Sequence, residues 1–216
     1  MKVIKKITWL AVLLASVFSL ATAYAQINLD ITKGVGGNGI PIAVVPFGGQ
    51  APENIASIVA ADLKRTGKFM PQSSTDRADY AVVGQAAPGG SRGYIVQFQL
   101  TGAQGSQLLS LSFDVPGNQL RAVAHRISDL IYEKLTNEKG LAGTRIAYVA
   151  LGRGVHYLVV ADADGNNPQV ILRSSQPIMS PAWSPDGSKL AYVSFEGRRA
   201  QIIVQDVYTG ARRSVS

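Results

Sequence analysis

Alternation of apolar and polar residues is clearest in two segments, 94–101 and 108–115. In each of them nearly every second residue is large and apolar, and the residues between are mostly glutamine, serine or aspartate. A period of two is typical of a strand with one buried face. Runs of strand-forming residues at 42–47 and 79–85 add two more segments. The pattern therefore predicts four strands in this part of the chain.

Two other segments, 53–65 and 118–137, have apolar residues three or four positions apart, which is the spacing of an amphipathic helix. We expect Pro52 in the first turn of the first helix and Asn118 as the N-cap of the second. The resulting order is β-α-β-β-β-α. It predicts an α+β domain over residues 40–144, with a mixed sheet covered by two helices.

The remainder of the chain repeats itself. The pentapeptide that begins at Arg145 recurs at Lys189, 44 residues later, and the segments that begin at Tyr157 and Gln201 share the same offset. A period of ~40–45 residues with short strands is typical of propeller blades. We therefore expect residues 145–216 to form the start of an all-β propeller. They account for fewer than two of a presumed six blades, so the propeller in this chain is expected to be incomplete.

The stretch SPAWSPDGSKLAYVSFE at 180–196 contains a turn sequence, Ser-Pro-Asp-Gly, between two strand-like segments. Proline presets φ, aspartate can bond its own backbone, and glycine supplies a positive φ. We expect residues 184–187 to reverse the chain and Trp183 to pack between blades rather than bind a ligand.

The first 25 residues have the organisation of a secretory signal peptide. Three lysines precede an apolar run without charge at 7–21, and a small-x-small sequence follows at 23–25. An N-terminal membrane anchor is the alternative, but the apolar run is shorter than the ~20 residues that span a bilayer. No later segment is long and apolar enough to do so.

Composition narrows the range of functions. The chain is 46% apolar, which indicates a globular protein, and it contains no cysteine, which excludes thiol catalysis and thiolate metal sites. Its formal net charge is +7, but three of the lysines belong to the predicted signal peptide. The other basic residues are spread among acidic ones, so nucleic acid is not an expected partner.

Several motifs resemble functional sites but have the wrong context. The glycine pattern at 34–39 leads into a strand rather than a helix, and the G-x-S-x-G sequence at 89–93 lies between two strands. The aspartates at 162–167 fit a β-turn better than a calcium loop. Of the two histidines, His125 is expected to project away from the apolar stripe of its helix, and His156 precedes a strand. We predict no catalytic, cofactor-binding or metal site.

A set of longer stretches is more specific than these motifs. They are residues 41–47, 51–55, 58–63, 66–69, 82–85, 133–136, 144–149 and 175–187. Together they resemble the TolB family, the periplasmic propeller proteins of the Tol-Pal system. The resemblance extends over the whole chain, and it is most specific in the last stretch, which contains the Trp-Ser-Pro-Asp-Gly sequence.

The resemblance implies a non-enzymatic scaffold in the periplasm of a Gram-negative bacterium, which maintains outer-membrane integrity and supports cell division. Its implied partners are TolA, the lipoprotein Pal and other outer-membrane proteins. Pal would bind the propeller, mostly through later blades. TolA would bind an N-terminal arm, which is followed by a glycine-rich linker up to residue 39. The matching arm consists of Gln26, Ile27, Asn28, Leu29, Asp30, Ile31, Thr32 and Lys33.

Alternating Ile27, Leu29 and Ile31 suit the addition of the arm as a strand to a partner's sheet. From the residues alone, without the resemblance, a frayed terminus is the preferred interpretation. Two other functions stay open. Propeller repeats of this kind also precede the hydrolase domain of dipeptidyl-peptidase-like enzymes, and a sugar-binding periplasmic module would need an aromatic-lined pocket for which the sequence offers little.

Overall fold

The structure is a computed structural model that describes residues 39–102 and 105–215. The predicted signal peptide at 1–25 and the arm at 26–33 lie outside the described residues. None of the helices within the described ranges is long and apolar enough to cross a membrane.

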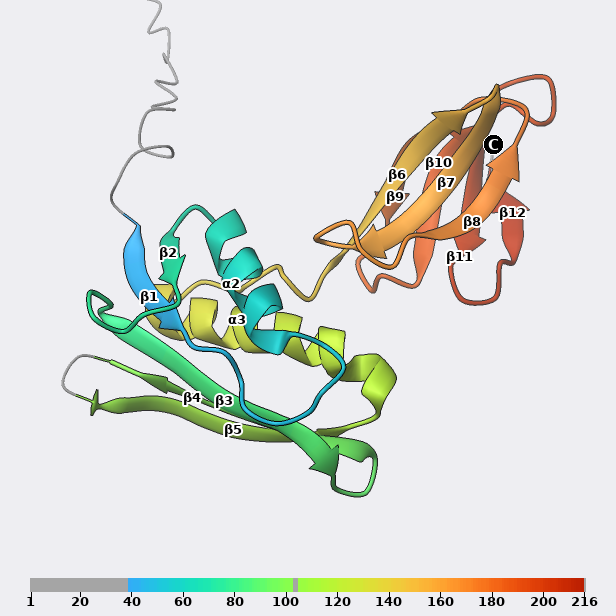
Figure 1. Ribbon diagram of the computed structural model, residues 1–216. Coiled ribbons are helices and arrows are strands. Elements are labelled where there is room, and N and C mark those ends of the chain that lie inside the picture. Colours follow the sequence, from blue (N-terminus) through green and yellow to red (C-terminus); the bar gives the residue numbers. More distant parts are fainter. Residues whose placement is uncertain (1–38, 103–104, 216) are drawn as a thin grey trace, which may run out of the picture. The chain divides into compact units, whose positions relative to one another are not determined.

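The first part of the chain forms a five-stranded mixed sheet with two helices on one face, which confirms the predicted α+β fold (Figure 1). The strand order is β2-β1-β3-β4-β5, with β1 parallel to both neighbours and β3, β4 and β5 antiparallel. The elements are β1 (Ile40–Val44), α2 (Ile55–Arg65), β2 (Phe69–Gln72), β3 (Tyr80–Gly89), β4 (Gly93–Thr101), β5 (Gln107–Val115) and α3 (Leu120–Thr136).

The core of this layer lies between the helices and the apolar face of the sheet. Val96, Phe98 and Leu100 of β4 are fully buried against Leu63 of α2 and Ile127 of α3. The intervening residues of β4 are exposed on the other face, as the alternation predicts. Polar residues therefore cover the side of the sheet that carries no helix.

The structure corrects three local expectations. Strand β2 was not predicted, and it pairs in parallel with β1 from Ile40 to Ala43. Helix α2 begins at Ile55 and is capped by Asn54, whose side chain accepts from the Ser57 amide at 3.0 Å, so Pro52 precedes the helix. A short 3-10 turn (Gly117–Gln119) precedes α3 and includes Asn118, which therefore does not cap the helix.

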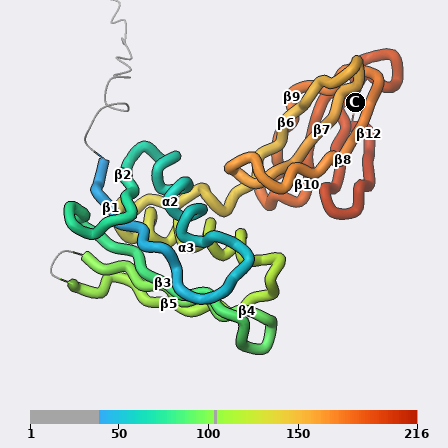
Figure 2. Tube along the Cα trace, in the orientation of Figure 1, coloured from blue at the N-terminus to red at the C-terminus, as the bar shows by residue number. Residues whose placement is uncertain are grey.

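The second part of the chain forms two antiparallel sheets, as expected for the beginning of a propeller. A three-stranded sheet is followed by a four-stranded one, in which the order β12-β11-β10-β9 makes a simple meander. Figure 2 traces this part of the chain from β6 to the red C-terminus. The strands are β6 (Arg145–Gly152), β7 (Val155–Asp162), β8 (Gln169–Ser174), β9 (Ile178–Trp183), β10 (Lys189–Ser194), β11 (Gln201–Asp206) and β12 (Arg212–Ser214).

The sequence repeat corresponds to the strands. The β6–β7 hairpin and the β10–β11 hairpin begin at the two copies of the repeated pentapeptide, Arg145 and Lys189. The second sheet has one further strand, β9, which pairs with the edge of β10 that faces away from β11. The positions one period before β9 lie at the end of α3 and in the connection after it, so no described strand pairs with the free edge of β6.

The two sheets share a core. It contains Leu158 and Val160 of the first sheet and Ile178, Leu190 and Tyr192 of the second. A chain of two hydrogen bonds crosses this core. The Tyr192 hydroxyl donates to Gln205 Oε1 at 2.8 Å, and Gln205 Nε2 donates to the Ile171 carbonyl at 3.0 Å. Because buried polar groups need partners, this chain fixes the register of one sheet on the other.

The Ser-Pro-Asp-Gly turn reverses the chain between β9 and β10, as predicted. The Gly187 amide donates to the Ser184 carbonyl at 2.9 Å, and Gly187 has a φ of 67°. The Arg145 guanidinium at the start of β6 lies 4.8 Å from the centre of the Trp183 ring and donates to the Gly187 carbonyl at 2.7 Å. Trp183 therefore packs between the two sheets.

Candidate functional site

The residues expected to bind TolA, 26–33, lie outside the described residues. Within the described ranges, the most concentrated group of buried ionisable side chains lies between α2, α3 and the turn that joins β7 to β8. It consists of Asp62, His125 and Asp164, with Arg121 beside them.

Asp62 and His125 form the centre of this group. Their side chains are only 1% and 4% exposed, and His125 Nδ1 donates to Asp62 Oδ2 at 2.7 Å. The Ser128 hydroxyl donates to the same carboxylate oxygen at 2.9 Å. Arg65 Nη1 donates to the other oxygen at 2.8 Å, from a side chain that is 46% exposed. The Asp62 carboxylate thus joins α2 to α3.

Electrostatics favours the charged forms of both residues. Burial raises the pKa of the Asp62 carboxyl, but the hydrogen bonds from His125, Arg65 and Ser128 outweigh it, so the pKa lies below its ordinary value. The hydrogen bond to Asp62 raises the pKa of the His125 imidazole above 6.5, against the opposing effect of burial. The negative charges of Asp62 and Asp164 raise it further.

The β7–β8 turn brings two further carboxylates to α3. Arg121 Nη2 donates to Asp164 Oδ2, and Arg121 Nε lies 3.6 Å from Asp162 Oδ2. A main-chain hydrogen bond also holds the turn, because the Ala163 amide donates to the Thr144 carbonyl at 3.0 Å. His125 Nε2 points into this group, 3.8 Å from Asp164 Oδ2, and has no hydrogen-bond partner.

The arrangement does not suit acyl transfer. In a serine hydrolase the histidine Nε2 takes the proton of the nucleophile while a carboxylate holds Nδ1. Here Asp62 holds Nδ1 of His125, but the hydroxyl of Ser128, which bonds the same carboxylate, donates to Asp62 and to the Ala124 carbonyl.

The same residues could in principle hold a metal ion, since one ligand atom from each of Asp62, His125 and Asp164 lies within 4.8 Å of the others. However, the Asp62 carboxylate already accepts three hydrogen bonds, and Asp164 forms an ion pair with Arg121. Because its carboxylates are neutralised by protein cations, the group is better described as an ion-pair cluster than as a metal site.

A cavity of 420 Å³ lies next to the cluster. Asp62 and Ser128 form part of its wall, together with Leu63, Tyr132 and residues 139–142 and 144. The lining is mainly apolar. Of its polar side chains, Asp62 accepts from Arg65 and Ser128, and Asp129 accepts from the Ala142 and Gly143 amides. The cavity therefore offers few free groups to recognise a polar ligand.

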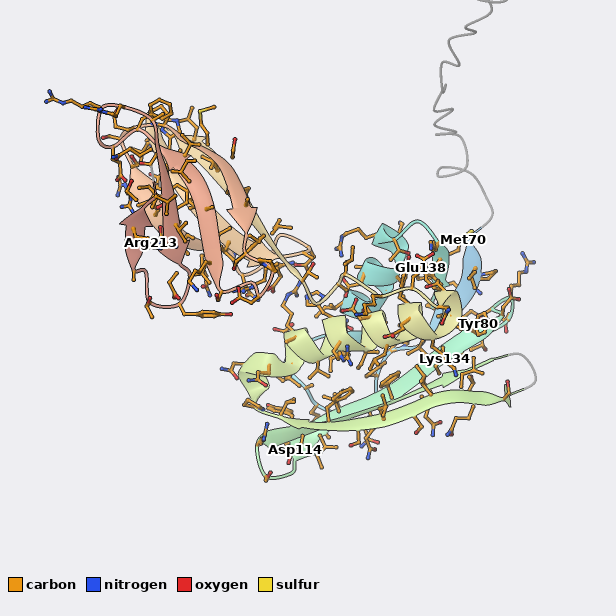
Figure 3. All side chains as sticks on the ribbon, turned by 180° about the vertical axis from the view of Figure 1, so that it is seen from behind. Met70, Tyr80, Asp114, Lys134, Glu138 and Arg213 are labelled. Carbon is orange, nitrogen blue, oxygen red and sulfur yellow. The ribbon has the colours of Figure 1, made fainter. Side chains whose placement is uncertain are left out.

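Two of the motifs with the wrong context, at 89–93 and 162–167, lie in turns, whereas most of the glycine pattern at 34–39 lies outside the described residues. In the β3–β4 turn, the Ser91 amide and hydroxyl donate to Asp114 Oδ2 at 2.8 and 2.6 Å, and the Arg92 amide donates to Oδ1 at 3.1 Å. Asp114 is labelled in Figure 3, beside this hairpin. In the β7–β8 turn, the Asn166 amide donates to the Asp164 side chain at 3.0 Å. Both segments are confirmed as turns.

The sequence analysis missed the ion-pair cluster. His125 does lie off the main apolar stripe, but it is buried because α2 covers that second face of α3. Arg121, His125, Ser128 and Tyr132 recur at intervals of four, three and four residues, which is helical spacing. This polar row was the available signal, whereas nothing in the sequence places Asp164 beside it.

Comparison with known proteins gives two family matches. Residues 27–77 match a model described as the TolB amino-terminal domain, and residues 132–216 match one described as the TolB beta propeller domain. The crystal structure of TolB from Acinetobacter baumannii is similar to 83% of this chain, with a TM-score of 0.77 and 34% identity, over 50% of that protein.

Curated relatives agree with these matches. The Tol-Pal system protein TolB of Nitrosococcus oceani is 42% identical over 98% of this chain, and that of Haemophilus influenzae is 43% identical over all of it. The chain spans 55% and 57% of the length of these two relatives. Over the amino-terminal domain and the first part of the propeller, which it shares with them, the chain belongs to the TolB family.

Proposed function

We propose that this protein is a periplasmic, non-enzymatic scaffold of the Tol-Pal system. It binds TolA through the arm at 26–33 and Pal through its propeller, and so contributes to outer-membrane integrity and cell division. The observation that carries the proposal is the 42% identity to a Tol-Pal system protein TolB over 98% of the chain. The signal sequence at 1–25 directs it to the periplasm.

The amino-terminal match favours this scaffold over a propeller-containing peptidase. It covers residues 27–77 and does not depend on the repeats, which unrelated propellers share. The Asp62–His125 pair also favours a structural role, because its hydroxyl neighbour donates to the carboxylate rather than to the imidazole. A hydrolytic assay with dipeptide substrates should show no turnover above the buffer control.

Strand addition explains how a short arm could bind TolA. Main-chain hydrogen bonds supply affinity in this mode, and alternate side chains fill pockets in the partner. The arm has Ile27, Leu29 and Ile31 on one side of an extended chain, and Asn28 and Asp30 on the other. The apolar side is expected to face the TolA domain.

Deletion of residues 26–33 tests the proposal. We expect the deletion to abolish binding to the C-terminal domain of TolA in isothermal titration calorimetry, while circular dichroism and thermal unfolding stay as in the undeleted chain. Unchanged affinity would rule out the arm as the binding segment.

A matched pair of variants tests the face that binds. Replacing Ile27, Leu29 and Ile31 by serine should weaken binding strongly, whereas replacing Asn28 and Asp30 by serine should change it little. Equal losses in both variants would contradict strand addition with an apolar contact face.

A further inference from the structure

His125 lies between carboxylates from two separate parts of the chain. Asp62 of α2 accepts from Nδ1 at 2.7 Å, and Asp164 of the β7–β8 turn has its Oδ2 3.8 Å from Nε2. The imidazole is nine-tenths buried, so water cannot readily replace either contact. Its position gives one titratable group control over how α3 and the turn interact.

We propose that His125 acts as a proton-dependent latch, which holds the β7–β8 turn against α3 while its imidazole is charged and loosens the turn when it is neutral. This inference rests on the geometry of the cluster and is independent of the proposed function.

The charge of the His125 imidazole decides whether its Nε2 attracts or repels the Asp164 carboxylate. The hydrogen bond to Asp62 fixes a proton on Nδ1, so a neutral imidazole must present a lone pair at Nε2. That lone pair would face the Asp164 carboxylate, and two acceptors facing each other in a buried place repel. A charged imidazole carries a proton on Nε2 as well, and this N–H is directed at Asp164.

Charged groups from three elements surround the imidazole. From α2 they are Asp62 and Arg65, which bonds the far oxygen of Asp62; from the β7–β8 turn they are Asp164 and Asp162; from α3 itself there is Arg121. The carboxylates favour the charged imidazole and the guanidiniums oppose it. Because Arg121 still holds Asp164 after His125 loses its proton, the turn should loosen rather than detach.

The direction of the pH dependence follows from linkage. The pKa of His125 is raised above 6.5 in the folded chain, so the contact is complete below that pH and weakens as pH rises through the folded pKa. Asp62 and Asp164 have lowered pKa values and stay ionised down to pH values below 3.8. The latch should therefore be closed in mildly acidic solution and open in alkaline solution.

The test is an NMR titration of the purified chain, with two readouts. The first is the midpoint of the His125 imidazole. The second is the protection of the Ala163 amide against exchange, corrected for the intrinsic effect of pH, because this amide donates to Thr144 where the turn is held. Protection should fall as pH passes the His125 midpoint.

Two variants and one control variant connect the readouts. Asp164→Asn should lower the His125 midpoint, by about one unit if the turn contributes a tenfold change in the contact equilibrium. In the wild type, the protection of the Ala163 amide against exchange should fall by the same factor, about tenfold, as His125 loses its proton. His125→Gln should remove the pH dependence of Ala163, while His156→Gln, which changes the other histidine, should leave it intact.

Two results would overturn the latch. One is a His125 midpoint that is the same in wild type and Asp164→Asn; the other is wild-type protection at Ala163 that does not change across that midpoint. If His125→Gln fails to fold, Asp164→Asn still decides the matter, because asparagine keeps the size of the side chain and one acceptor oxygen and removes only its negative charge.

Discussion

Asp62 should contribute far more to stability than a surface aspartate with the same number of hydrogen bonds. We consider Asp62→Ala, which removes the acceptor of His125, Ser128 and Arg65 in one step. The matched change is Asp114→Ala, since Asp114 also accepts three hydrogen bonds, from Ser91 and Arg92 in the solvent-exposed β3–β4 turn.

The expected size follows from burial. Removing one partner of a buried ion pair typically costs about 3–5 kcal/mol, because the other charge is left without compensation. Arg65 is 46% exposed, so its share is only ~0–1 kcal/mol. We therefore expect Asp62→Ala to lower the free energy of unfolding by about 3–5 kcal/mol. This is a large part of the ~5–15 kcal/mol that typical domains have.

Urea denaturation at neutral pH provides the measurement. Helical circular dichroism reports on α2 and α3, whereas the fluorescence of Trp183 reports on the four-stranded sheet. The two signals therefore show which part of the chain loses stability. Asp62→Ala should shift the helical transition strongly and Asp114→Ala only slightly. The reasoning would be refuted if Asp62→Ala cost about 1 kcal/mol or less, or no more than Asp114→Ala.

Three further predictions follow from the structure. Ile127→Ala should cost about 2–5 kcal/mol in the same denaturation assay, because Ile127 is fully buried, whereas Leu141→Ala, at a side chain 71% exposed, should stay within about 0.5 kcal/mol. Gly187→Ala should cost about 1–2 kcal/mol in the fluorescence transition, since a φ of 67° strains any residue with a Cβ; no loss would contradict the turn. Lowering the pH below 3.8 should destabilise the wild type more than Asp62→Ala. The pKa of Asp62 is lowered in the folded chain, so the stability that its carboxylate contributes is present above pH 3.8 and is lost as the pH falls through the folded pKa. The same change of melting temperature with pH in both proteins would contradict this.

Local periodicity was sufficient to predict most of the fold. The alternation in β4 and β5 identifies their buried faces, and the 44-residue offset from Arg145 to Lys189 identifies the repeated hairpins, because both signals depend on residues close in sequence. Strand β2 escaped prediction, since it has four residues including Pro71 and is defined by its parallel pairing with β1. Such pairing is long-range and leaves little local trace.

The ion-pair cluster could be predicted only in part, for a similar reason. The polar row on α3 was visible at helical spacing, but its burial depends on the packing of α2 and on the β7–β8 turn. The aspartates of that turn are explained by the turn itself, because the Asp164 side chain accepts from the Asn166 amide. The same carboxylate also meets Arg121, and only the folded chain shows this second role.

The free edge of β6 has a practical consequence. About every second residue of this eight-residue strand directs its main-chain donor and acceptor to the side away from β7, where no described strand occupies the place that β9 takes beside β10. An edge of this length is a template for pairing with another extended chain. Solutions of the chain should therefore self-associate more as concentration rises, and a proline placed within β6 on the side away from β7 should increase solubility at the expense of that pairing.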